Sequence, residues 1–230
     1  MENRKYRHEL KFLCDEAQLL LLEKRIQHIC KSDKHACESG TYMIRSLYFD
    51  TMDNACYLEN EMGTDRRKKY RIRIYNGKTD YIKLECKYSI YNMKAKESCR
   101  ITKEQCQQLM KGKPVSGLQE EQELLRRFLV ERRLQLLEPK VIVEYVRTPY
   151  IYEAGNVRVT FDRNISSAGT SGFLSGCGTR RSILPSNVHV LEVKYDEVFP
   201  SAILDMVAGG QQLSKTSFSK YALCREYSTR

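Results

Sequence analysis

The segment RKKYRIRIY, residues 67–75, alternates basic and apolar side chains. Because successive side chains of a β-strand point to opposite faces, Lys69, Arg71 and Arg73 would share one face. The tyrosine and isoleucines between them would share the other face and pack in a core. The segment therefore predicts a strand with one basic face and one apolar face.

The same alternation recurs in the two segments that follow, residues 81–88 and 94–101. Their polar faces consist mostly of charged residues. These are Lys83, Glu85 and Lys87 in the first segment and Lys94, Lys96, Ser98 and Arg100 in the second. A solvent-exposed sheet face can explain any alternating strand, but closely spaced cations repel one another and destabilise a sheet. A polyanion bound against this face would remove that repulsion.

The rest of the chain predicts further strands with short helices between them. Two more strands with charged faces, residues 4–13 and 189–196, carry Glu9, Lys11 and Glu192. Other strands are expected at residues 42–50, 140–147, 151–153 and 157–162, helices at residues 15–29, 103–110, 120–137, 200–207 and 218–227, a short turn or helix at residues 51–58, and a Gly/Ser-rich loop at residues 166–178. Helices and strands do not alternate one for one, which predicts an α+β protein. We find no linker, so residues 1–230 are expected to form a single domain.

Closing about eight of these strands into a ring would bring their charged faces together. The result would be an antiparallel β-tunnel with a polar lumen and with helices packed against its apolar outer surface. A confined basic lumen suits a chain of phosphates, because arginine can bind phosphate oxygens through two parallel hydrogen bonds. Divalent cations that bridge phosphates prefer carboxylate ligands. Glu9, Glu85 and Glu192 are therefore the candidate metal ligands.

The composition indicates an anionic partner but does not choose one. Lysine and arginine number 39 and aspartate and glutamate number 29, which gives a net charge of +10. Nucleic acid, acidic lipid and phosphate-rich small molecules are all compatible with this charge, and so are scattered surface lysines that maintain solubility. No apolar run approaches the roughly 20 residues of a membrane span, and the charged N-terminus shows no secretory signal. We therefore expect a cytoplasmic protein.

Familiar catalytic and metal-binding motifs do not occur in the sequence. It contains no phosphate-binding GxxxxGK[ST] loop, no GxGxxG motif and no HExxH motif. The nine cysteines include no CxxC pair, so we interpret them as small core residues. The four histidines are too dispersed to form a ligand set.

Seven segments, in this order, resemble those of a known family. They are RHELKF (residues 7–12), RSLYFDT (45–51), RKKYRIRIY (67–75), KLECK (83–87), EYVRTPY (144–150), LEVKY (191–195) and SFSKY (217–221). Together they resemble the VTC domain, the catalytic domain of polyphosphate polymerases, within the triphosphate tunnel (CYTH-like) superfamily. The wider superfamily often begins with Glu-x-Glu-x-Lys. Here Arg7 takes the first position, which favours the VTC branch over a classical triphosphatase.

The resemblance implies a set of phosphate-contacting residues in a tunnel that binds ATP and polyphosphate. It assigns catalytic roles to Arg71, Arg73, Lys87 and Arg147, phosphate contacts to Lys11, Lys94 or Lys96, Tyr145, Ser219 and Lys220, and the metal to Glu192. The implied reaction transfers the γ-phosphate of ATP to a growing polyphosphate chain with manganese or magnesium as cofactor.

Two alternative functions stay open at this point. One is a triphosphatase of the same fold, in which water replaces the phosphate acceptor. The other is a non-enzymatic sensor of polyphosphate or inositol phosphate, or a nucleic-acid-binding protein. A closed lumen would exclude duplex nucleic acid. A membrane-protein partner that receives the product is compatible with the sequence, which leaves the oligomeric state open.

Overall fold

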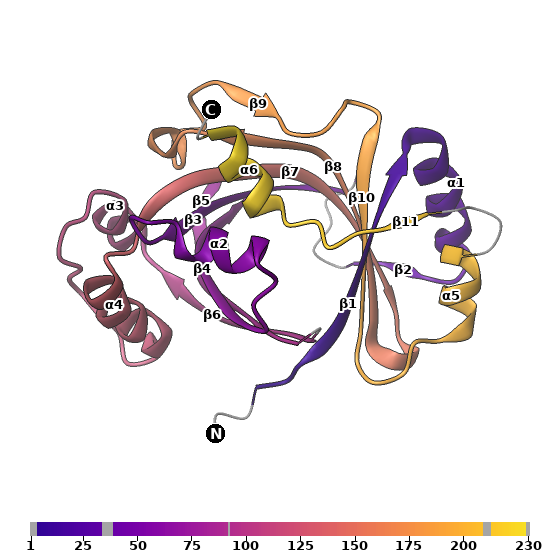
Figure 1. The fold of residues 1–230 in the computed structure, drawn as a ribbon, viewed down its shortest axis with the longest axis horizontal. Coiled ribbons are helices and arrows are strands. Elements are labelled where there is room, and N and C mark those ends of the chain that lie inside the picture. Colours follow the sequence, from indigo (N-terminus) through magenta and orange to yellow (C-terminus); the bar gives the residue numbers. More distant parts are fainter. Residues whose placement is uncertain (1–3, 34–38, 92, 209–212, 229–230) are drawn as a thin grey trace.

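The computed structural model describes residues 4–33, 39–91, 93–208 and 213–228. Eight antiparallel strands hydrogen-bond in a closed ring (Figure 1). In ring order they are β3 (Tyr42–Asp50), β4 (Arg66–Tyr75), β5 (Lys78–Ile90), β6 (Met93–Ile101), β1 (Arg7–Asp15), β10 (Val188–Tyr195), β8 (Val157–Ala168) and β7 (Glu138–Tyr152), and β7 pairs with β3 again. The predicted α+β class and the ring of about eight strands are confirmed.

The ring is closed unevenly. β1 and β6 share only two residue pairs, Arg7 with Lys94 and His8 with Met93, whereas β1 and β10 are paired along eight residues of each strand. Three short strands add to the ring: β2 (Lys31–Ser32) pairs with β7, β9 (Arg180–Ser182) with β8, and β11 (Ser214–Lys215) with β1. The contact between β1 and β6 is therefore the weakest join of the ring.

Two groups of helices cover the outer surface of the ring, on opposite sides in Figure 1. α3 (Lys103–Met110) and α4 (Glu123–Gln135) pack on β4 and β5, where Ile72, Leu84 and Phe128 are buried together. α1 (Glu16–Gln27) and α5 (Ser201–Ala208) pack on β8 and β10, where Leu22 and Val193 are buried. The prediction that helices cover the apolar outer faces is confirmed.

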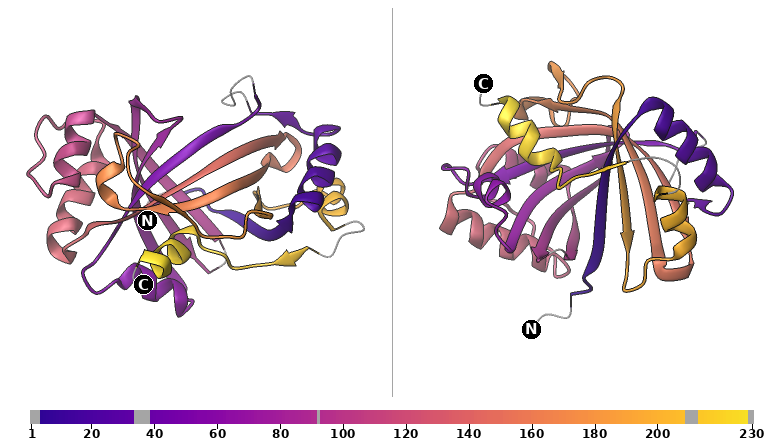
Figure 2. Two further views of the ribbon diagram at one scale, coloured as in Figure 1. Left: turned by 90° about the horizontal axis from the view of Figure 1, so that it is seen from above. Right: turned by 45° about the vertical axis from the view of Figure 1, so that its right-hand side comes forward.

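A third hydrophobic cluster lies on the inner side of the ring, which the sequence did not predict. α6 (Lys220–Ser228) packs its Tyr221 and Cys224 against Tyr145 and Ile165 of β7 and β8. α2 (Ala55–Glu61) lies beside α6, and both helices lie across the ring in Figures 1 and 2. The inner faces of β3 and β7 are partly apolar, so one part of the interior is a packed core and the remainder is charged.

Two sequence predictions about strand ends were wrong. The strands expected at residues 140–147 and 151–153 form one strand, β7, which continues through Pro149. Proline has no N–H to donate to a neighbouring strand, but the pairing of β3 with β7 stops at Arg147 and does not reach Pro149, so no hydrogen bond to β3 is lost. The carbonyl of Pro149 accepts the backbone N–H of Asp33 instead. β8 continues to Ala168 instead of ending at Asp162, through a bulge opposite Tyr145 where Asn164 has a φ of 53°.

Two general features complete the description. Among the described helices, none is long and apolar enough to cross a membrane. Eight cysteines lie in the described ranges, and all of them are free thiols. Seven of these eight are buried or packed in the core clusters on both sides of the sheet, namely Cys14, Cys30, Cys56, Cys86, Cys99, Cys106 and Cys224. This agrees with their interpretation as small core residues.

Candidate functional site

Charged side chains from seven strands and α6 meet inside the ring, and we call them the lumen cluster. Its cations are Lys11, Arg71, Arg73, Lys87, Lys96, Arg147, Lys194 and Lys220, and its carboxylates are Glu9, Glu85, Asp162 and Glu192. Each member lies within 4.0 Å of an oppositely charged member. Eight cations against four carboxylates leave an excess of four positive charges.

The lumen cluster is only partly shielded from water. The carboxylates of Glu85 and Asp162 have no exposed surface, but the side chains of Lys87 and Lys96 remain 30% and 46% exposed. The carboxylates therefore lie at the wall of the ring, while lysine ammonium groups reach toward its interior. This is the arrangement expected for cations that meet an anionic ligand from the water-filled side.

Glu85 organises the arginines of β4. Its carboxylate accepts Arg71 Nε at 2.8 Å and lies 3.0 Å from Lys96 Nζ and 3.6 Å from Arg73 Nη1. Arg71 Nη1 also donates to Tyr48 Oη at 2.8 Å. Burial alone would raise the pKa of Glu85, but Arg73, Arg71 and Lys96 lower it well below its usual range. The predicted metal ligation by Glu85 stays a prediction, and its contacts here are all with cations or strand neighbours.

Glu9 and Glu192 form the second part of the lumen cluster. Lys194 Nζ lies 3.5 Å from Glu9 and 2.5 Å from Glu192, so it joins the two carboxylates. Burial raises the pKa of both carboxylates, and Glu192 also raises the pKa of Glu9. Surrounding cations, among them Lys87 and Lys194, overcome both effects and lower the pKa of each. Both groups are therefore held as carboxylates, although they repel each other.

The donor chemistry of Glu9 and Glu192 fits a divalent cation. Magnesium and manganese prefer carboxylate oxygens, and magnesium is usually held by one or two carboxylates together with substrate phosphates and water. Within the described ranges, no group of three or more His, Cys, Asp or Glu side chains forms a complete metal site. A divalent cation at this site would therefore be held by the two carboxylates together with phosphate oxygens of a bound ligand.

Asp162 organises the cations of β7 and α6. It accepts Nε and Nη2 of Arg147 at 2.6 and 2.8 Å, and its second oxygen lies 2.7 Å from Lys220 Nζ. Sequence reasoning missed Asp162 and Lys194. Lys194 stands on the same predicted strand face as Glu192, so the alternation of residues 189–196 could have identified it. Asp162 ended a predicted strand, and nothing in the local sequence distinguished it from a surface residue.

Lys94 and Lys96 both belong to the inner face of β6. Lys96 contacts Glu85, whereas Lys94 Nζ donates to the hydroxyl of Ser89, its partner across β5 and β6. Burial lowers the pKa of each lysine. The structure therefore admits both residues as phosphate contacts, with Lys94 nearer to the short β1–β6 join.

Tyr145 and Ser219 lie next to the predicted cations. The guanidinium carbon of Arg147 is 5.3 Å and Lys220 Nζ is 5.0 Å from the centre of the Tyr145 ring. Ser219 Oγ accepts the backbone N–H of Ala222 at 3.3 Å, which leaves its own hydroxyl hydrogen free to donate. Lys11 Nζ donates to the carbonyl of Phe218 at 2.8 Å, so β1 also contacts this segment.

Arg7, which departs from the superfamily pattern, is not part of the lumen cluster. Its Nε lies 2.8 Å from Asp196, and it also donates to the carbonyl of Asn156. The position that often carries a carboxylate in the superfamily therefore supplies no metal ligand here. Glu9 and Glu192 are left as the acidic pair.

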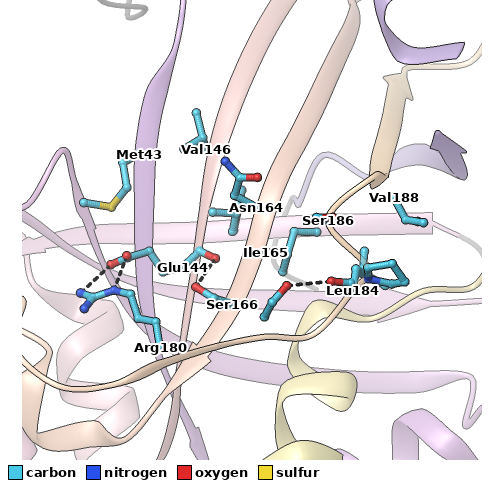
Figure 3. Close-up of a pocket in the computed structure, with 13 residues that line it drawn as sticks. Met43, Glu144, Val146, Asn164, Ile165, Ser166, Arg180, Leu184, Ser186 and Val188 are labelled. Carbon is cyan, nitrogen blue, oxygen red and sulfur yellow. Dashed lines mark hydrogen bonds and ion pairs between the residues drawn. The ribbon is translucent and has the colours of Figure 1, made fainter. Parts of the chain in front are cut away.

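A cavity of about 410 Å³ lies outside the lumen cluster, although Tyr145, a predicted phosphate contact, is among its lining residues (Figure 3). Its lining includes Met43, Glu144 and Val146 on the outer face of β3 and β7, together with Arg180 of β9. Arg180 Nε lies 2.5 Å from Glu144, which also pairs with Arg45. Its charged groups are therefore already paired with one another, in contrast to the excess of cations inside the ring.

A comparison with protein families shows to which family this chain belongs. The family described as the VTC domain matches residues 6–228, nearly the whole chain. The chain belongs to the VTC domain family. A search of curated proteins found no match to this VTC domain.

Solved structures with little sequence similarity share the fold of this VTC domain. A candidate adenylate cyclase from Bacillus halodurans has a TM-score of 0.53 at 15% identity, over 90% of this chain and 92% of that chain. A candidate adenylyl cyclase from Hippeastrum, described with a dominant triphosphatase activity, has a TM-score of 0.54 at 14% identity, over 97% of this chain and 96% of that chain. At such identities the likeness shows the fold, which is that of triphosphate tunnel proteins.

Proposed function

We propose that this VTC domain is a metal-dependent polyphosphate polymerase that transfers the γ-phosphate of ATP to a growing polyphosphate chain inside the ring. The observation that carries the proposal is the lumen cluster, in which cations from many separate elements meet inside one ring of strands. Family membership supports the same reaction. We also propose a cytoplasmic location, where ATP is available.

The charge balance of the lumen cluster supports a polyanionic ligand. Eight cations held close together repel one another, and four carboxylates offset only part of this repulsion. Linked phosphates would supply the missing negative charge, with one charge or more on each phosphate. A ring of eight strands is also too narrow for a nucleic acid duplex, which argues against duplex nucleic acid as the partner.

The residues of the site suit an in-line phosphoryl transfer. A terminal oxygen of the polyphosphate chain would attack the γ-phosphorus of ATP, the new P–O bond would form, and the bond to the β-phosphate oxygen would break to release ADP. Arg71, Arg73 and Arg147 would neutralise charge on the transferred group and keep its oxygens in place. No protein nucleophile is required, so no serine or cysteine is assigned.

Glu9 and Glu192 would hold the manganese or magnesium ion. Such an ion would supply electrostatic stabilisation of the charge that develops on the phosphate oxygens. Lys87 and Lys194, which contact these carboxylates in the structure, would then be available to phosphate oxygens. Glu85 is proposed as a weaker candidate ligand, because among the described residues it shares no cation with a second carboxylate, whereas Glu9 and Glu192 share Lys194.

A triphosphatase is the second candidate function. The fold shared with the Hippeastrum protein, described with a dominant triphosphatase activity, favours it. The same cations and carboxylates would serve, and water would replace the chain end as the acceptor. The two functions differ in their product, because the polymerase retains the phosphate in a chain and the triphosphatase releases it.

Incubation of the purified protein with ATP and manganese tests the proposal. A polymerase yields ADP and a ladder of polyphosphate on a stained gel, with little free phosphate. A triphosphatase yields free phosphate in the same tube without a ladder. Intact ATP together with tight polyphosphate binding would contradict both and indicate a sensor.

A further inference from the structure

Asp162 joins two cations that are far apart in the sequence. Its Oδ1 accepts Arg147 Nε, and its Oδ2 accepts Arg147 Nη2 and lies 2.7 Å from Lys220 Nζ. Arg147 belongs to β7, and Lys220 is the first residue of α6. A single carboxylate therefore sets the relative position of a strand cation and a helix cation.

The sheet fixes the position of Asp162. Asp162 is paired with Arg147 across β7 and β8 and with Val190 across β8 and β10, so both sides of its backbone are held by neighbouring strands. Its side chain has no exposed surface, and the side chains of Arg147 and Lys220 are 10% and 11% exposed. The three groups thus form a rigid, nearly water-free unit at the wall of the ring.

The contacts of Asp162 differ from those of a metal ligand. Both of its oxygens already accept hydrogen bonds from Arg147, and Lys220 also contacts it. The cations near Glu192, Lys194 at 2.5 Å and Arg147 at 3.8 Å, both lie at its Oε1. No three-carboxylate group that includes Asp162 forms a metal site within the described part of the chain. Its chemistry here is that of an acceptor for guanidinium and ammonium groups.

The start of α6 is held to the ring by further contacts that support the same role. Lys11 Nζ donates to the carbonyl of Phe218 at 2.8 Å, and Tyr221 Oη donates to the carboxylate of Asp50. Asp50 also accepts the backbone N–H groups of Cys56 and Tyr57 at the start of α2. The contact between Asp162 and Lys220 differs from these contacts, because it is an ion pair inside the lumen cluster.

We propose that Asp162 is a positioning residue, which orients Arg147 and draws the first residue of α6 into the lumen so that their remaining N–H groups face a bound phosphate chain. The proposal depends on one part of the proposed function, namely that the lumen binds linked phosphates. Asp162 itself touches neither the phosphates nor the metal. The helix that carries Lys220 thereby becomes part of the binding site.

The test measures tripolyphosphate binding by calorimetry, without metal, for the full chain and for Asp162→Asn. We expect the affinity to fall about tenfold or more, since the loss of the charged acceptor that aligns Arg147 and Lys220 outweighs the removal of one negative charge from the lumen. The manganese concentration that half-saturates activity should stay within about twofold of the original, which a metal ligand would not allow. Glu144→Gln removes a carboxylate on the outer face and should leave tripolyphosphate affinity unchanged.

A double-mutant cycle separates positioning from a general loss of stability. If Asp162 acts through Lys220 and Arg147, then Asp162→Asn combined with Lys220→Ala should weaken binding less than the sum of the two single effects. Asp162→Glu keeps the charge and should fold, yet it displaces the carboxylate and should still weaken binding.

Three results would overturn the inference. The first is an unchanged tripolyphosphate affinity in Asp162→Asn or Asp162→Glu. The second is full additivity of the two single effects in the double-mutant cycle. The third is a large shift in the manganese concentration that half-saturates the activity of Asp162→Asn. Failure of the unsubstituted protein to bind tripolyphosphate would instead contradict the proposed function.

Discussion

Lys87 Nζ lies 2.9 Å from each carboxylate oxygen of Glu9, on a strand that is not a neighbour of β5 in the ring. The pair therefore reaches past β6 inside the lumen. Burial, together with nearby Lys11 and Lys194, lowers the pKa of Lys87 to about 7 in spite of Glu9. One of the cations proposed to bind phosphate thus changes its charge near neutral pH.

The charge of Lys87 should make phosphate binding depend on pH. Below about pH 7 Lys87 is protonated and attracts phosphate, and above that pH the free protein loses this charge. Tripolyphosphate itself titrates in this range, so the measured quantity is the ratio of the affinity of the unsubstituted protein to that of Lys87→Arg. This ratio should fall by up to about tenfold between pH 7 and pH 8. Calorimetric titration across this range checks the ratio. A constant ratio would show that Lys87 keeps its charge or does not contact phosphate.

Removal of Glu85 should destabilise the ligand-free protein more than removal of Arg71. Within the described residues, Glu85 is the one carboxylate within 4.0 Å of Arg71, Arg73 and Lys96. Glu85→Gln leaves these cations uncompensated and should cost about 3–5 kcal/mol. Arg71→Ala leaves Glu85 with two cations and should cost less. Urea unfolding measures both values.

Added tripolyphosphate distinguishes the cause of this loss of stability. If repulsion among cations destabilises Glu85→Gln, the ligand should restore much of the melting temperature. An equal cost for the two variants, or no restoration by the ligand, would indicate that packing and not charge determines the effect.

Glu192→Gln should separate metal binding from phosphate binding. The substitution removes one of the two carboxylates joined by Lys194, and the manganese concentration for half-maximal activity should rise about tenfold or more. Polyphosphate affinity without metal should be kept or increased, because a negative charge leaves the lumen. Activity with an unchanged manganese requirement would exclude Glu192 as a metal ligand.

The short join between β1 and β6 should exchange its amide hydrogens early. The two strands share the pairs of Arg7 with Lys94 and His8 with Met93, and few hydrogen bonds resist opening there. Hydrogen exchange of β6 should therefore be faster than that of β4, which forms nine residue pairs with β5 and five with β3. Bound polyphosphate should slow the exchange of β6, because it contacts cations from both strands. Equal protection of β4 and β6 would contradict this.

Much of the ring followed from local sequence, because strand alternation records which side chains share a face. Arg71, Glu85 and Lys96 were predicted to face one lumen, and they form one group of ion pairs. The position of α6 could not be obtained in this way. Its apolar face requires some packing partner, but the inner faces of β3 and β7 offer one only after the ring has closed.

The contacts of Asp162 also could not be predicted from the sequence. Arg147 lies 15 residues before it on β7, whereas Lys220 lies far along the chain on α6. Only the three-dimensional arrangement shows that one carboxylate serves both. The pairing of Lys194 with Glu9 and Glu192 likewise depends on the register of β1 and β10, in which Glu9 is opposite Lys194.

The central claim is that the cations inside the ring, and not the general positive charge of the protein, bind linked phosphates. The most direct test is equilibrium binding of long-chain polyphosphate to two double variants of equal charge. Arg71→Ala with Arg147→Ala should weaken binding about a hundredfold or more. Lys103→Ala with Arg133→Ala, at exposed positions on α3 and α4, should change it by no more than about threefold. Equal losses in the two variants would place the ligand on the outer surface and contradict the account.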